Sequence, residues 1–118
     1  MDIREKIAIA VKALDSKKAV DIKVIDVTGL SSLADYFIVA SGNSSTHVKS
    51  LADEAEYQLT TNGAELDHIE GRSTSWILLD FDDVIINVFS AESRNFYDLE
   101  RLWVDGTELD ISEFIVKE

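Results

Sequence analysis

The chain has no cysteine, and basic residues are scarce in its second half. The absence of cysteine excludes disulfides, iron–sulfur clusters, a thiolate nucleophile and cysteine-based zinc sites. No apolar run approaches the roughly 20 residues that a membrane-spanning helix needs. The first residues, M-D-I-R-E-K, contain no apolar signal-peptide region and are too acidic for a typical transit peptide. These features predict a cytoplasmic protein with no membrane partner.

The net charge of −12 comes from the second half of the chain. Residues 1–50 carry seven Lys or Arg and six Asp or Glu, a net of +1, whereas residues 51–118 carry four and seventeen, a net of −13. An acidic surface repels phosphate backbones and attracts basic proteins. We therefore expect a protein partner and no direct dependence on nucleic acid.

The length of 118 residues and the hydrophobic fraction of 46% suit a single domain with its own core. Helical spacing of apolar residues follows a capping Asp2 over residues 3–14 and recurs over residues 45–61. Residues 21–27 alternate as in a strand, and residues 35–41 are apolar on both sides, as in a central strand. A short strand is expected over residues 65–70. The pattern predicts a mixed α/β layer structure with helices mainly on one face of a mixed sheet.

Residues 76–90 read as two strands joined by a two-residue turn at Asp82-Asp83. The implied register forms one wholly apolar side from the pairs Phe81 with Val84, Leu79 with Ile86 and Ile77 with Val88. The opposite side mixes polar and apolar groups in the pairs Asp80 with Ile85, Leu78 with Asn87 and Trp76 with Phe89. Such a mixed side suits a partner better than a core.

Residues 90–103 have helical spacing, with Ser90 placed to cap the helix. One stripe is expected to anchor this helix to the domain, and it contains Phe96, Leu99, Leu102 and Trp103. The other side is expected to face away and to be free to bind, and it contains Arg94, Tyr97 and Arg101. Trp76 and Tyr97 are therefore predicted to be exposed anchors for a partner.

No group of residues indicates catalysis, a metal or a cofactor. The two histidines, His47 and His68, have no neighbouring ligand pattern, and no G-x-S-x-G motif accompanies the serines near residue 41. A hairpin turn accounts for the aspartates at 80–83 as well as Mg²⁺ would. The S-G-N-S turn at 41–44 favours helix capping over phosphate binding.

Two runs closely resemble the Iojap family of ribosomal silencing factors, RsfS. They are T-G-L-S-S-L-A-D-Y-F-I-V-A-S-G-N-S at 28–44 and W-x-L-x-D-x-x-D-V-x-x-x-V-F-x-x-E-x-R-x-F-Y-x-L-E-R-L-W at 76–103. The similarity covers about residues 1–105, which leaves residues 106–118 as an acidic C-terminal tail. Its apolar residues, which fold back on the domain or on a neighbour, are Leu109, Ile111, Phe114, Ile115 and Val116.

The resemblance implies a domain of nucleotidyltransferase-like topology that forms homodimers, has no enzymatic activity and takes no small-molecule substrate. It implies binding to the fourteenth protein of the large ribosomal subunit, where the small subunit would join, so that translation is repressed in starvation or stationary phase. The family's binding positions map onto Trp76, Leu78, Asp80, Arg94, Tyr97, Glu100 and Trp103.

The chain departs from the family at Asp82, where Gly is usual, and at Asn87, where His is usual. Two other functions remain open beside silencing, namely a step in assembly of the large subunit and a nucleotidyltransferase-like, nucleotide-binding enzyme. The enzyme would use Ser41-Gly42 with the aspartates near residue 80. That reaction requires a close Asp pair on the strand that follows the Gly-Ser turn, and a similar fold does not transfer chemistry. Silencing is therefore the preferred hypothesis.

Overall fold

A six-stranded mixed sheet forms the centre of the computed structural model, which describes residues 1–71 and 75–115. Its strands are β1 (Val20–Asp26), β2 (Tyr36–Gly42), β3 (His68–Glu70), β4 (Trp76–Asp80), β5 (Val84–Ser90) and β6 (Thr107–Leu109). The order across the sheet is β3-β4-β5-β2-β1-β6, and of the five pairings between these described strands only β2 with β5 is parallel. The predicted central position of residues 35–41 is confirmed, whereas β3 is shorter than predicted.

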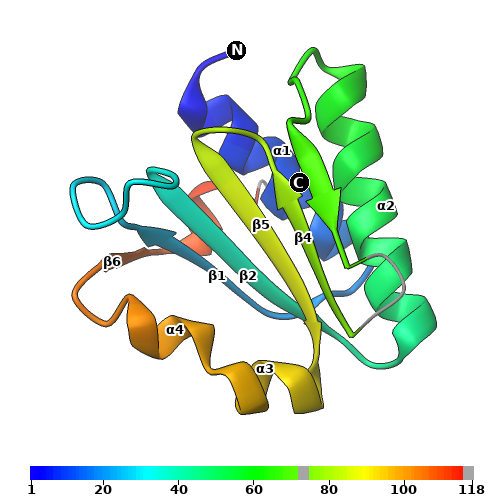
Figure 1. The fold of residues 1–118 in the computed structure, drawn as a ribbon. Coiled ribbons are helices and arrows are strands. Elements are labelled where there is room, and N and C mark those ends of the chain that lie inside the picture. The colour runs from blue at the N-terminus through cyan, green and yellow to red at the C-terminus, as the bar shows by residue number, and fades with distance from the viewer. Residues whose placement is uncertain (72–74, 116–118) are drawn as a thin grey trace.

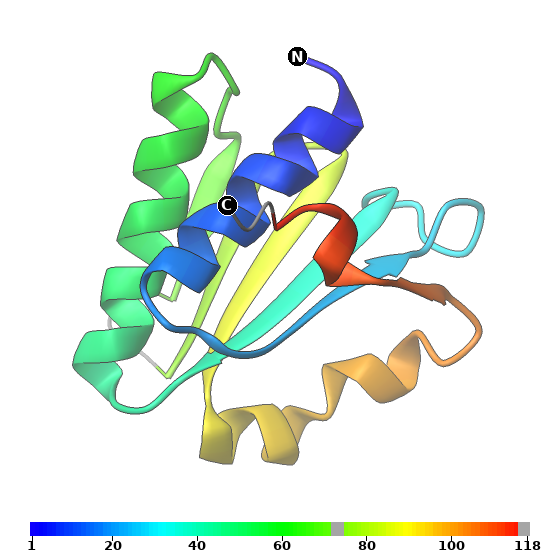
Figure 2. The same ribbon diagram turned by 180° about the vertical axis from the view of Figure 1, so that it is seen from behind.

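Helices α1 (Ile3–Ser16) and α2 (Ser45–Thr61) cover one face of the sheet, as predicted (Figures 1 and 2). Between these helices and the sheet lies the main core, whose fully buried members include Ile7, Leu14, Leu51, Leu59, Ile77, Leu79 and Phe81. Burying one such side chain stabilises the fold by about 1.5–3 kcal/mol. No helix within the described ranges has the length and apolar character needed to cross a bilayer.

Side chains cap both long helices, as predicted. The Asp2 carboxylate accepts the backbone N–H of Glu5 at 2.9 Å, and Ser44 Oγ accepts that of His47 at 3.1 Å. Gly42 approaches α2 so closely that a Cβ there would lie 2.9 Å from the Val48 nitrogen. The S-G-N-S turn therefore caps α2 and allows close packing of its first turn.

The β4–β5 hairpin has the predicted register. Trp76 lies opposite Phe89, Leu78 opposite Asn87 and Asp80 opposite Ile85. Asp82 has a φ of 73°, in the left-handed region that costs a residue other than glycine roughly 1–2 kcal/mol. This conformation explains why glycine suits the position. Lys6 Nζ donates to Asp83 Oδ1 at 2.6 Å, which ties the turn to α1.

Two short helices follow β5 in place of the single helix predicted over residues 90–103. They are α3 (Ala91–Tyr97) and α4 (Leu99–Leu102), separated by Asp98 with a left-handed φ of 45°. The Ser90 hydroxyl caps α3 as predicted, by accepting the N–H of Ser93 at 3.1 Å. Because the chain bends at Asp98, the spacing of one continuous helix does not apply to both pieces.

The predicted anchoring stripe of this segment is confirmed for Leu99 and Trp103 and wrong for Phe96 and Leu102. Phe96 is 79% exposed and Leu102 is 69% exposed, whereas Leu99 and Trp103 are partly buried. Arg94, expected to face away from the domain, is only 8% exposed. The reason is that α3 turns its Arg94 side to the sheet, where the guanidinium meets hydrogen-bond acceptors on β1 and β2.

Residues 107–115 fold back onto the domain, which decides between the two placements considered for the tail. β6 pairs antiparallel with β1, with Glu108 opposite Ile25, and Phe114 is buried in the main core. Gly106 permits this turn, because a Cβ there would lie 2.8 Å from Ile25 Cγ2. Val116 lies outside the described residues.

Candidate functional site

The sheet face opposite α1 and α2, which we call the open face, carries most of the predicted binding residues. Along β4, Ile77 and Leu79 are buried in the main core, so the alternate residues Trp76, Leu78 and Asp80 point to the open face. Helices α3 and α4 lie across only one end of this face (Figure 1). The predicted two-sided character of the hairpin is therefore confirmed.

A smaller apolar cluster lies on the open face. Its buried members are Ile25, Val27, Ala34, Phe37 and Ile85, and the partly buried Leu78, Leu99 and Trp103 pack against them. The Trp103 ring meets that of Phe37 edge-on, with centroids 5.0 Å apart. Leu78 and Trp103 therefore help to hold α4 against the sheet and are only partly available to a partner.

An aromatic stack of Trp76, Phe89 and Tyr97 lies beside this cluster. The Trp76 ring is 4.9 Å from that of Phe89 and 4.8 Å from that of Tyr97, centroid to centroid. Phe89 is fully buried, Trp76 is partly buried and Tyr97 is 50% exposed. Trp76 Nε1–H donates to Asn87 Oδ1 at 3.1 Å, so an amide serves as acceptor where the family usually has histidine. Tyr97 is an exposed aromatic residue as predicted, whereas Trp76 is partly covered.

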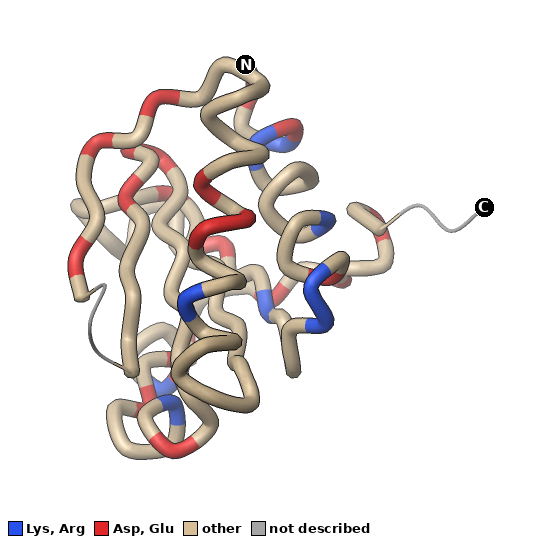
Figure 3. Tube along the Cα trace, turned by 90° about the vertical axis from the view of Figure 1, so that its right-hand side faces the viewer, with Lys and Arg blue, Asp and Glu red and all other residues tan. Residues whose placement is uncertain are grey.

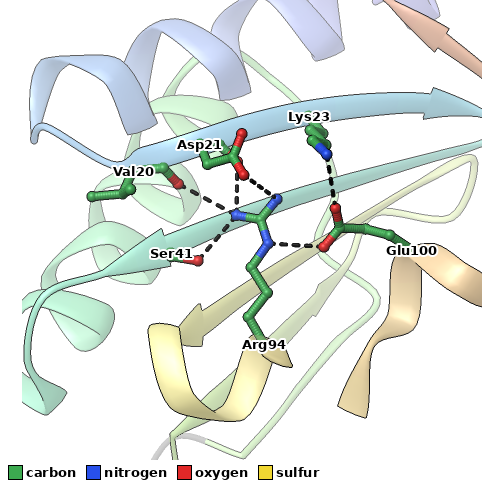
Figure 4. A network of polar contacts seen from close by, with 6 residues as sticks. All are labelled: Val20, Asp21, Lys23, Ser41, Arg94 and Glu100. Atoms are coloured by element: carbon green, nitrogen blue, oxygen red, sulfur yellow. Dashed lines mark hydrogen bonds and ion pairs between the residues drawn. The ribbon is translucent and has the colours of Figure 1, made fainter. Parts of the chain in front are cut away.

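Arg94 of α3, itself buried, is the centre of a polar network (Figure 4). Its Nη1 donates to the Asp21 carbonyl oxygen at 2.7 Å and to Ser41 Oγ at 3.0 Å. Its Nε donates to Glu100 Oε1 at 2.9 Å, and Lys23 Nζ pairs with the other Glu100 oxygen at 3.1 Å. These bonds connect α3 and α4 to β1 and β2.

The charges in this network shift one another. The hydrogen bond from Arg94, with a further one from Lys23, lowers the pKa of Glu100 below its usual value against the opposing effect of burial. The hydrogen bond to Glu100 in turn raises the pKa of Lys23. Both groups therefore stay charged at neutral pH, and the network persists there.

Asp67, His68 and Asp80 form the one group among the described residues whose ligand atoms meet the spacing for a metal, within 4.8 Å of one another. His68 Nδ1 lies 3.2 Å from Asp67 Oδ2 and 3.6 Å from Asp80 Oδ2. The expectation that His68 has no neighbouring ligand pattern is wrong, because the β3–β4 pairing places it opposite Asp80. Direct contacts of the His68 ring with these carboxylates account for the same distances without a metal.

Acidic residues surround this end of the open face. Glu65, Asp67 and Glu70 lie on β3 or just before it, and no Lys or Arg occurs between residues 62 and 71. Figure 3 shows acidic positions along this edge and on α2. The surroundings of Asp80 therefore attract positively charged groups.

A sequence model of the family described as ribosomal silencing factor during starvation matches residues 1–118. The chain belongs to the RsfS family. Ribosomal silencing factor RsfS of Bacillus subtilis is 38% identical over 112 residues, which cover 94% of this chain and 95% of that protein. The chloroplastic Iojap protein of Zea mays is 27% identical over 106 residues, which cover 85% of this chain and 44% of that protein.

A crystal structure of a protein from Chromobacterium violaceum has the same fold, with a TM-score of 0.86 at 35% identity, covering 93% of this chain and 92% of that one. RsfS relatives are named as silencing factors, which are regulatory proteins and not enzymes. The nucleotidyltransferase alternative is therefore set aside.

The structure brings most of the predicted binding positions into pairs. The Trp76 ring contacts the Tyr97 ring at a tilt, Leu78 and Trp103 share the smaller cluster, and Arg94 pairs with Glu100, while Asp80 lies apart beside His68. Asp21, Lys23 and Ser41 were missed by the sequence reasoning, although they hold the Arg94–Glu100 pair. They lie more than 50 residues from Arg94 in the chain, so no local pattern connects them.

Proposed function

We propose that this protein binds the large ribosomal subunit through its fourteenth ribosomal protein and blocks joining of the small subunit, so that translation is repressed in starvation. The observation that carries the proposal is the aromatic stack, in which the half-exposed Tyr97 lies over Trp76 on the open face. Exposed aromatic side chains are typical centres of protein interfaces. The family description, a ribosomal silencing factor during starvation, agrees with this role.

Charge favours a basic protein as the contact, with no requirement for ribosomal RNA. Asp80 points to the same open face as the stack and lies beside the acidic residues around β3, and opposite charges on a partner would speed and orient its docking. The residues proposed to touch the partner are Trp76, Leu78, Asp80, Tyr97, Glu100 and Trp103. Tight, salt-sensitive binding to naked ribosomal RNA would contradict this part of the proposal.

Homodimerisation and a cytoplasmic location belong to the same proposal. Phe96, Leu102 and Val104 are 69–79% exposed, and apolar side chains gathered on a surface often mark an interface. The cytoplasmic location is proposed together with the partner, because a silencing factor acts where its ribosomes are. Light scattering should give a dimer mass at micromolar concentration, and a monomer mass there would refute the dimer.

Co-sedimentation with isolated large subunits tests the proposed surface. Tyr97→Ala should weaken binding about 30-fold, the loss of roughly 2 kcal/mol that an aromatic hot spot typically contributes. Tyr57→Ala is the matched control, because Tyr57 is 62% exposed on α2, which covers the opposite face of the sheet. Equal binding by the two variants, or no binding by the parent, would contradict the proposal. A subunit-joining assay then measures silencing, and the parent should lower the yield of joined ribosomes.

A further inference from the structure

Helices α3 and α4, which we call the arm, have little apolar attachment to the domain. Arg94 is the only buried residue of α3, and α4 has none. Leu99 and Trp103, partly buried on the smaller cluster, hold the α4 end. Apart from the ring contacts of Tyr97 and the hydrogen bond between Ser93 and Ser75, the end that carries Tyr97 is attached through the polar bonds of Arg94.

The guanidinium of Arg94 directs its hydrogen bonds inward. Nη1 bonds to Asp21 O and Ser41 Oγ, and Nε bonds to Glu100. The remaining nitrogen, Nη2, is buried and lies 3.6 Å from Asp21 Oδ2. Figure 4 shows the group enclosed between β1, β2 and α4. A partner docked on the open face would meet the Tyr97 ring, while the Arg94 charge stays beneath the arm.

These contacts require the shape of arginine as well as its charge. A planar guanidinium donates in several fixed directions at once, and Arg94 uses them to reach β1, β2 and α4 together. A lysine ammonium at this position keeps the positive charge but cannot place donors at both Nε and Nη1. Arg94→Lys therefore separates the role of the charge from the role of the geometry.

We propose that Arg94 is a positioning residue for partner binding, which acts by holding Tyr97 against Trp76 and makes no contact with the partner. This inference rests on the proposed function, because it concerns the same binding surface. It reassigns the one family binding position that the structure buries. Tyr97 and Trp76 form the contact surface, and the network of Arg94, Glu100, Asp21 and Ser41 fixes the angle at which the arm presents it.

A double-mutant cycle on binding to large subunits tests this role. Arg94→Lys alone should weaken binding about tenfold although the charge is retained. In the Tyr97→Ala background the same change should weaken binding no further, because the residue that Arg94 positions is already absent. Arg101→Lys is the matched control, because the Arg101 side chain is 84% exposed on α4, and it should bind as the parent does. Additive losses, or parental binding by Arg94→Lys, would overturn the inference.

A second variant tests whether Arg94 positions Tyr97 if the Arg94→Lys protein unfolds below the assay temperature. Ser41→Ala removes one hydrogen bond to Arg94 from a residue that is 4% exposed and lies beneath the arm. Two- to fivefold weaker binding that disappears in the Tyr97→Ala background supports positioning, and parental binding overturns it. If the parent itself fails to bind large subunits, the proposed function fails instead.

Discussion

Apolar spacing alone places both Phe81 and Phe96 against the domain, whereas the structure buries Phe81 and exposes Phe96. Replacing each by alanine tests this difference. Phe81 is fully buried in the main core, so Phe81→Ala should cost about 3–5 kcal/mol. A chain of this length has a total stability of roughly 6–18 kcal/mol, at about 0.05–0.15 kcal/mol per residue. The midpoint of thermal unfolding should therefore fall by about 12–20 °C, at roughly 4 °C per kcal/mol.

Phe96→Ala is the matched control on the arm. Phe96 is 79% exposed, and its ring touches that of Tyr97 edge-on at 5.1 Å. Loss of this contact costs about 0.5–1.5 kcal/mol, and the better helix propensity of alanine returns up to about 0.5 kcal/mol. Circular dichroism melting of both variants against the parent measures the two effects. Equal melting midpoints for the two variants would refute the assignment of Phe81 to the core and Phe96 to the surface.

Three further changes test particular features by their effect on stability. Asp82→Gly should raise stability by about 1 kcal/mol, because glycine adopts its φ of 73° without strain, and thermal melting against Asp82→Ala checks this. Glu100, whose pKa Arg94 lowers, stabilises the fold above its ordinary pKa of 4.5 and loses this contribution as the pH falls through the lowered value. Urea unfolding between neutral pH and about pH 3 should therefore show a smaller loss of stability for Glu100→Gln than for the parent. Gly106→Ala should cost about 1–3 kcal/mol, because its Cβ would lie 2.8 Å from Ile25 Cγ2, and an unchanged melting midpoint would contradict that close approach.

The elements predicted well from sequence are those whose signals lie close together in the chain. Asp2 caps α1 and Ser44 caps α2 through backbone groups three residues away. The hairpin register follows from one two-residue turn and strict alternation, so the division of β4 between two faces could be read directly. Caps, periodicity and turns involve only a few neighbouring residues. They therefore predict α1, α2 and the hairpin without information on long-range contacts.

The predicted binding residues also differ in whether local sequence signals were enough to place them. Tyr97 was correctly placed on the surface by its spacing, whereas Arg94 was placed there wrongly by the same reasoning. The spacing of one helix carries no information about Asp98, whose left-handed backbone separates α3 from α4. Helical spacing also carries no information about the hydrogen-bond acceptors on β1 and β2 that stabilise the buried Arg94 side chain.

The fold class, the long helices, the two-sided hairpin and the acidic character of the second half could all be predicted from the order of the amino acids. The burial of Arg94, the contact of His68 with Asp80 and the pairing of β6 with the sheet became evident from the packed fold alone. Each of these depends on residues at least 12 positions apart in the chain. Such pairings depend on how whole strands and helices pack. A buried charge is stable only where the fold supplies hydrogen-bond partners, and an edge strand only where the fold supplies a neighbouring strand.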